Sequence, residues 1–336
     1  MAAIFPVVGS GAFDTNPSYS GSFIPQLWSN KLNAKFYLNT MMTEIANTDW
    51  EGEIKNQGDS IRIRTAPSIV IDDYAGAGAT LTTRVPVPIF QDMQINKGKY
   101  FSVQINDVLA HQADMDLMNM FTDDAAKQLK IAIENEAFFN WFVTEGAKAV
   151  TNRGAVAGAI SGSYALGTDV APLNDATAGM VLKTILNMSA TLDEQNVPEE
   201  GRWLIISPVE RQALMESSMA QAYFTGDASS IVRTGKIGMI DRFTVYVSNL
   251  LPKGTTSKAT VAGLTAASAG ATLTNAKPRR MMVAGTKHAC AFASQIAKTE
   301  PLRNQTDFGD IVRGLAVYGR KVVKNDALVT ALIGTP

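Results

Sequence analysis

The sequence predicts an α+β protein in which a centre of sheet and helix carries three projections. Three observations support this prediction. Residues 1–22 are rich in Gly, Ser and Pro, and such a segment builds no core of its own. Residues 53–105 contain stretches in which apolar and polar side chains alternate, which is the period of a strand. Residues 114–147 repeat apolar side chains every three or four positions, which is the period of a helix.

The composition indicates a protein that associates with other proteins. The 336 residues are 46% hydrophobic and 18% charged, whereas ordinary soluble domains are about 25% charged. Thirty Lys and Arg against 31 Asp and Glu leave a net charge of −1, so little repulsion keeps copies apart. A dedicated nucleic-acid binder would carry a basic excess, which this sequence lacks. At about 150 residues per domain, the length predicts roughly two domains.

Cysteine and histidine content restricts the possible chemistry. Cys290 is the one cysteine, so no disulfide can form within the chain, and with His111 and His288 it falls short of a four-ligand zinc site. No apolar run approaches the ~18 residues of a membrane span. Residues 1–30 contain no Lys or Arg, so no secretory signal is expected. We therefore expect a chain that is made and kept in a cytoplasm, without a membrane partner.

A helix and then a long hairpin are expected after the N-terminal arm. Residues 23–48 repeat bulky apolar side chains at helical spacing. Residues 60–65, SIRIRT, place isoleucines on one face of a strand and arginines on the other, and 68–74 and 100–105 alternate in a similar way. The AGAGA stretch at 75–79 suits a loop tip. We interpret 53–105 as a two-stranded excursion, which is marginal alone and needs a surface to lie on.

The long segment 114–147 gives the strongest helix signal. Apolar residues follow one face, and Asp123, Lys127, Lys130 and Glu134 follow another at spacings that pair opposite charges. About 33 residues at 1.5 Å each make a rod of roughly 50 Å. Eight acidic residues and two lysines between 107 and 145 give this region a net charge of −6, which leaves about +5 for the rest of the chain. We expect these oppositely charged regions to meet between subunits.

The second half of the sequence alternates helices, strands and loops. Residues 150–172 and 253–278 are small and polar and are expected to be loops. Asn174 is the expected cap of a helix that ends before Pro198. Ser207-Pro208-Val209-Glu210 has the pattern of a capping box, which marks a helix start. Strands are expected at 203–206, 243–248, 281–284 and 311–323.

Enzyme motifs are absent or incomplete. Neither a phosphate-binding loop nor a G-x-S-x-G elbow occurs. His288 and Cys290 could suggest a thiol nucleophile, but a lone cysteine among alanines is more often a core residue. The acidic helix could bind a divalent metal, although a solvated face is the commoner outcome. Nucleic-acid binding depends on many phosphate contacts, and the two arginines Arg62 and Arg64 are too few for it. They suit salt bridges between subunits.

Four stretches of the sequence are distinctive: FIPQLW at 23–28, GDSIRI at 58–63, GMIDRFTVYVSN at 238–249 and FGDIVRGLAVYG at 308–319. Taken in order, they resemble the major capsid proteins of tailed bacteriophages. The resemblance implies the Hong Kong 97-type capsid fold. It implies an N-terminal arm at 1–52, an extended β-hairpin loop at 53–106 and the spine helix of a peripheral domain at 107–149. An axial domain would follow at 150–285, and the return strands of the peripheral domain at 286–336.

The resemblance also implies a function. In this family, hexamers and pentamers of the chain form an icosahedral shell around packaged double-stranded DNA. This implies a structural, non-enzymatic virion protein that needs no cofactor or metal and assembles in the host cytoplasm. The implied partners are copies of itself, a portal, a possible decoration protein and DNA contacted non-specifically. Since the chain opens on a neutral arm and not on a charged helical segment, a scaffolding protein would be separate.

We expect inter-subunit contacts at the charged and glycine positions of the hairpin and the long helix. These candidates are Arg62, Arg64, Asp72, Asp73, Gly76, Gly78, Asp123, Asp124 and Glu134. Two alternatives stay open at this point. One is a nanocompartment shell protein of the same fold, and the other is a cytosolic hydrolase that uses the Cys290 region or the acidic helix.

Overall fold

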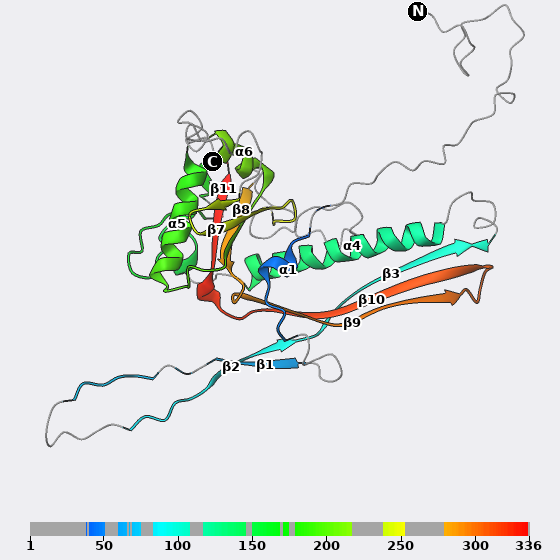
Figure 1. Ribbon diagram of the computed structural model, residues 1–336, viewed down its shortest axis with the longest axis horizontal. Helices are drawn as coiled ribbons and strands as arrows, with labels where there is room; N and C mark the ends of the chain where they lie inside the picture. Colours follow the sequence, from blue (N-terminus) through cyan, green and yellow to red (C-terminus); the bar gives the residue numbers. More distant parts are fainter. Residues whose placement is uncertain are drawn as a thin grey trace, which may run out of the picture.

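The computed structural model describes residues 38, 40–50, 60–65, 67, 69–74, 83–107, 117–145, 150–168, 171–174, 179–216, 238–252 and 279–334. Within these residues the chain forms three separate sheets. A lobe around the largest sheet lies on one side, and the helix α4 (Leu117–Phe139) extends from it together with a long three-stranded sheet (Figure 1). A two-stranded hairpin leaves the body below the long sheet (Figure 1).

The largest sheet has six strands in the order β4-β11-β8-β5-β7-β6. The strands are β4 (Leu173–Asn174), β5 (Arg202–Ile206), β6 (Met239–Ile240), β7 (Phe243–Val247), β8 (Arg279–Thr286) and β11 (Leu328–Gly334). β5 pairs parallel with β7 and antiparallel with β8. All residues of β5 and β11 are buried, which explains why their sequences are almost continuously apolar.

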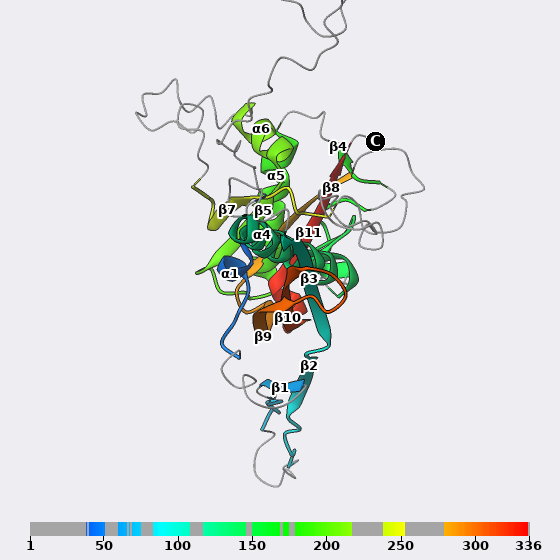
Figure 2. The ribbon, with the colours of Figure 1, turned by 90° about the vertical axis from the view of Figure 1, so that its right-hand side faces the viewer.

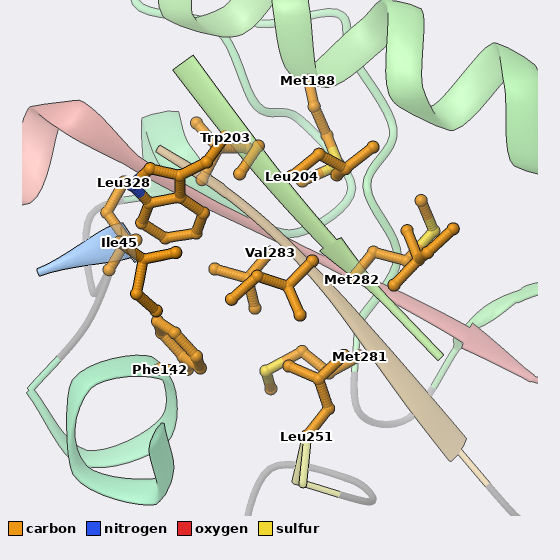
Figure 3. Close-up of a cluster of buried hydrophobic side chains, with 14 of the residues drawn as sticks. Ile45, Phe142, Met188, Trp203, Leu204, Leu251, Met281, Met282, Val283 and Leu328 are labelled. Carbon is orange, nitrogen blue, oxygen red and sulfur yellow. The ribbon is translucent and has the colours of Figure 1, made fainter. Parts of the chain in front are cut away.

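The main hydrophobic core lies between this sheet and the surrounding helices. Val283 and Leu328 come from neighbouring strands and lie on the same side as Trp203 and Phe142, whereas Leu204 lies on the other side beside Met188 (Figure 3). The helix α5 (Met180–Glu194) packs on β11 and on the helix α6 (Pro208–Glu216). Burying each large apolar side chain contributes about 1.5–3 kcal/mol. This core therefore holds the lobe and also the end of α4 that enters it.

The long sheet is antiparallel, with β10 (Gly309–Val322) between β3 (Lys97–Asn106) and β9 (Cys290–Arg303). α4 lies along this sheet and contacts β3 and β10 (Figures 1 and 2). Its last turn continues into a π-helical segment, Asn140–Thr144, whose Trp141 and Phe142 enter the main core. A β-bulge at Val317/Tyr318 shifts the register between β9 and β10.

The hairpin consists of β1 (Ser60–Thr65) and β2 (Ile89–Gln94), paired antiparallel. Beyond the paired strands, residues 69–74 and 83–88 continue without assigned strand structure, and in Figure 1 both run away from the body. The remaining short elements are α1 (Met42–Ile45) and the 3₁₀ turns Val150–Asn152 and Asn325–Ala327. The chain passes from β2 directly into β3, so the hairpin continues one edge of the long sheet.

Many elements predicted from the sequence are confirmed. Strands occupy 60–65, 203–206, 243–247, 281–284 and 311–322, as expected. The helix start at the capping box is also confirmed, since α6 begins at Pro208 and the Ser207 N–H donates to Glu210 Oε2 at 3.0 Å, while the Ser207 hydroxyl donates to the same carboxylate. Alternation and capping are local signals, and here the tertiary structure agrees with them.

Other predictions are wrong. Asn174 caps no helix, because it lies in β4 and the residue before α5 is Gly179, at a φ of 75°. Residues 69–74 pair with no strand. Residues 100–105 belong to β3, which pairs with β10. The return strand of the hairpin is therefore β2, and the hairpin is shorter than the two-stranded projection that we predicted for residues 53–105. Of the helix expected at 23–48, the described residues contain only Met42–Ile45.

Some predicted segments lie outside the described residues. They include the arm at 1–22, the loop tip at 75–79 with Gly76 and Gly78, and the loop at 253–278. Among the described residues, no helix combines the length and the apolar character that crossing a membrane requires.

Candidate functional site

The hairpin carries the two arginines that the sequence singled out. Arg62 lies opposite Asp92 in the strand register, and its Nε donates to Asp92 Oδ1 at 2.8 Å. This hydrogen bond raises the pKa of Arg62 and lowers that of Asp92. The guanidinium also lies over the Phe90 ring, 4.3 Å from its centroid. Arg64, two residues along the same face, is exposed. Because the Arg62–Asp92 pair is open to solvent, it contributes little to folding.

Beyond the paired strands, two extended segments expose large apolar side chains. These are Ile69, Val70, Ile71, Tyr74, Val85 and Val87, and Ile89 and Phe90 at the start of β2 are exposed as well. Ile71 is 87% exposed and Val85 is 83% exposed. Arg84 joins the two segments through a bidentate ion pair with Asp72, at 3.0 and 3.1 Å, and Asp73 is exposed. Single exposed apolar residues are ordinary, but eight of them on one projection favour a surface for association.

A small second core holds the base of the hairpin on the long sheet. Ile61, Ile63 and Met93 point inward from the hairpin and pack with Ala291, Ala293 and Val323. Gly319 of β10 allows this close approach, since a Cβ there would lie 2.8 Å from the Gln94 carbonyl oxygen. The hairpin is therefore fixed at its base, while its outer segments contact little else among the described residues.

A buried ionic network fixes α4 on the long sheet. Glu136 of α4 accepts from Lys99 of β3 at 2.9 Å, from Arg320 of β10 at 3.0 Å and from the Tyr318 hydroxyl at 2.9 Å. Burial alone would raise the pKa of Glu136, but these three donors lower it to about 2. At the far end of the sheet, Arg303 of β9 pairs with Asp107 and Asp310.

Glu134 lies six residues before the π-helical segment and binds the backbone at the start of α1. Its Oε2 accepts the backbone N–H groups of Met41 at 2.8 Å and Met42 at 3.1 Å. The side chain is 1% exposed, and burial raises its pKa to about 7. The expectation that Glu134 lies on a solvated face of the long helix is therefore wrong, because α4 turns this position toward the Met41–Met42 backbone.

The remaining acidic residues of α4 form no metal centre in the described part of the chain. Asp123 pairs with Lys127 one turn later, at 2.6 Å. No group of three or more His, Cys, Asp and Glu residues among the described positions has the geometry to hold a metal ion. The first turns of α4 also differ from the predicted apolar face, since Phe121 is 37% exposed and burial begins near Ile131.

Cys290 lies in the core, as the sequence indicated, and not in a reactive site. It is fully buried at the start of β9, and burial raises the pKa of its thiol. His288, two residues earlier, is exposed. A thiol nucleophile needs a lowered pKa and access to substrate. This pair has neither property.

The structure thus brings some of the predicted residues together and separates others. Arg62 and Asp72 each form an ion pair across the hairpin, whereas Glu134 is buried on α4. Sequence reasoning missed Asp92 and Arg84, and it considered Glu136 only as one acidic residue of the long helix. Pairing 60–65 with 89–94 would have placed Asp92 opposite Arg62, but the position of Glu136 depends on three elements that are distant in sequence.

Comparison with known proteins gives consistent results. The sequence model of a family described as phage capsid protein matches residues 91–332. A chain from Mycobacterium phage Che8 superposes with a TM-score of 0.70 at 23% identity, covering 92% of this chain and 97% of that chain. A capsid chain of cyanophage P-SCSP1u gives 0.69 at 16% identity, over 99% and 100%. One from the mature capsid of bacteriophage PhiM1 gives 0.62 at 13% identity, over 96% and 98%. A search of curated protein sequences finds no match.

Proposed function

Because this chain belongs to the phage capsid protein family and is a major capsid protein of the Hong Kong 97-type fold, we propose that its copies form hexamers and pentamers of an icosahedral head. The head would enclose double-stranded DNA. Self-assembly into a shell follows from membership of the family. We propose in addition the arrangement in hexamers and pentamers and the enclosed double-stranded DNA.

The exposed apolar surface of the hairpin is the observation that carries this proposal. Residues 69–74 and 83–90 expose eight large apolar side chains on a thin projection that lacks a core of its own. A protein that acts alone rarely exposes so many large apolar side chains on one projection. In a shell that is built from one protein, the neighbours of each chain are copies of the same chain. The hairpin therefore suits binding to a neighbouring copy.

We also propose how the lobe, the long sheet and the hairpin correspond to the domains of a capsid subunit. The lobe with the six-stranded sheet would be the axial domain at 150–285, although β11 at the C-terminus completes it. α4 and the long sheet would form the peripheral domain, built from 107–149 and 286–336. Residues 53–106 would supply the extended loop, apart from β3 (Lys97–Asn106), which belongs to the long sheet, and residues 1–52 would supply the N-terminal arm. The ion pair between Arg62 and Asp92 then lies at the root of the extended loop.

Further partners are proposed by analogy with the family alone. They are a separate scaffolding protein, a portal, a possible decoration protein and DNA that the inner wall contacts without sequence preference. Assembly would take place in the host cytoplasm. The net charge of −1 is compatible with this, because a strongly basic lining would bind DNA tightly.

Imaging and nucleic-acid content test the proposal together. We expect the expressed chain, alone or with its scaffold, to form closed particles in electron microscopy, and particles from infected cells to contain double-stranded DNA. A chain that stays monomeric at high concentration with its scaffold present would contradict shell formation. Closed particles that contain protein cargo in place of DNA would instead identify a nanocompartment.

A further inference from the structure

A groove between α4 and β9 has no occupant among the described residues. Its volume is about 510 Å³. Its apolar lining comes from five elements and consists of Met42, Phe101, Leu129, Ile133, Phe292, Leu315 and Ala316. On the helix side, the exposed Ala126 and the partly exposed Phe121 extend the apolar stripe of α4 toward its N-terminal end. One face of α4 is thus unpartnered.

One end of this groove is the place where the N-terminal chain arrives. Thr40, Met42 and Thr43 line the groove, and residues 23–37 precede them directly in sequence. A segment that enters here and follows α4 toward Ala126 needs no long connection, so closing the loop costs little entropy. A helix of 15 residues would be about 22 Å long, and α4 with its 23 residues is about 34 Å long, so α4 can carry it.

A buried carboxylate in the groove lacks a full set of partners. Glu134 lines the groove and is 1% exposed, and its Oε2 is used by the Met41 and Met42 N–H groups. Its Oε1 is buried and has no hydrogen-bond partner among the described residues. A buried charge without a partner is costly, so a donor or cation from the occupant of the groove would be favourable.

The residues just before Thr40 have the matching chemistry. In a helix, Trp28, Leu32 and Phe36 form one row at i, i+4 spacing, and Lys31 and Lys35 lie on the adjacent row with Leu27. Residues 23–37 contain these two lysines and no acid, whereas α4 contains four acids and two lysines. The apolar row suits the groove, and the lysine row suits the acidic helix and the free oxygen of Glu134.

We propose that residues 23–37 bind as an amphipathic helix in the groove between α4 and β9 of their own chain. The helix runs from Thr40 back toward the N-terminal end of α4. This contact is made within one chain, so it does not depend on shell assembly and goes beyond the proposed function. It gives the segment before α1 a defined partner in the unassembled subunit.

Disulfide trapping tests the contact in the full chain before assembly. We use the double variant Leu32→Cys/Ala126→Cys, with Asn30→Cys/Ala126→Cys as the matched control, because a position two residues before Leu32 lies about 200° around the proposed helix, on its opposite side. Cys290 is fully buried and adds little background. We expect the Leu32 pair to form an intrachain disulfide several-fold faster than the control pair, as read by peptide mass spectrometry on mixed isotope-labelled subunits.

Two results would overturn the proposal. Equal or absent cross-linking in both variants would show that the segment does not bind with this face. Disulfides between labelled and unlabelled chains would show that a second copy occupies the groove. As an independent measurement, Leu32→Asp should speed amide exchange in Ala126–Glu134 relative to Asn30→Asp, and identical exchange would also overturn it. Particle formation is read separately by electron microscopy, so failure of shell assembly is distinguishable.

Discussion

At the scale of single residues, Glu136 shows how one carboxylate can join three elements. It lies on α4 and receives hydrogen bonds from Lys99 on β3 and from Tyr318 and Arg320 on β10. Without Glu136, Arg320 would keep a buried charge without its acceptor, since its side chain is 6% exposed. Breaking a buried ionic network in this way is usually strongly destabilising.

The stability of the folded chain should therefore depend on pH through Glu136. Its pKa is lowered from 4.5 to about 2, so its contribution is fully present above about pH 4.5 and is lost as the pH falls toward 2. After allowance for solvent screening, the loss is about 2 kcal/mol. In urea titrations, Glu136→Gln should remove most of this pH dependence, whereas Glu300→Gln on the exposed part of β9 should not. Equal pH profiles for both variants would contradict this role.

The Arg62–Asp92 pair separates a contact within the chain from a contact between chains. Arg62→Asp should change the free energy of unfolding of the subunit little, because the pair is exposed. If Arg62 binds a neighbour, we expect particle yield to fall strongly in this variant. The swapped variant Arg62→Asp/Asp92→Arg restores the ion pair within the hairpin and should not restore particle yield. Full recovery in the swapped variant would mean that only the internal pair matters.

At the scale of elements, the hairpin is stable at its base and exposed along its outer segments. The base depends on a small core of Ile61, Ile63 and Met93 and on the close approach that Gly319 permits. The outer segments depend on the Asp72–Arg84 pair and expose their apolar side chains. This division suits an element that is held in place by its own chain and acts on another.

A side chain at Gly319 should loosen the base of the hairpin. A Cβ at this position would lie 2.8 Å from the Gln94 carbonyl oxygen and from Ile95, so β2 must shift. We expect Gly319→Ala to lower the free energy of unfolding by about 1–3 kcal/mol and to speed proteolysis within 60–95. Gly238→Ala is the matched control, because a Cβ there meets no atom within 4 Å. Similar losses in both variants would argue against a specific contact at Gly319.

The exposed apolar residues of the hairpin should matter for assembly and not for folding. Ile71 is 87% exposed, so Ile71→Asp should leave the melting temperature of the unassembled subunit almost unchanged. The same variant should reduce particle yield in sedimentation, because a neighbouring copy would have to bury the carboxylate. Ile71→Val serves as the conservative control. Normal particle yield from Ile71→Asp would place the contact between copies elsewhere.

At the scale of the whole molecule, the chain has one well-packed lobe and two long extensions with small cores. A contact between copies would bury parts of these extensions that are exposed in the single chain. Assembly should then stabilise the folded subunit by mass action, because only the folded form can bind its neighbours. We expect particles to melt at a higher temperature than unassembled subunits in scanning calorimetry. Equal melting temperatures would mean that assembly buries little of this surface.

The sequence by itself determined the alternating strands, the capping box at Ser207, the buried Cys290 and the resemblance to tailed-phage capsid proteins. These features depend on local periodicity, turn chemistry and short motifs, which residues close in sequence specify. The pairing of β3 with β10, the burial of Glu134 and the network at Glu136 were decided only by the tertiary structure. Each depends on elements that meet from distant parts of the chain, and the energy that selects their arrangement comes from packing and desolvation, which no local pattern records.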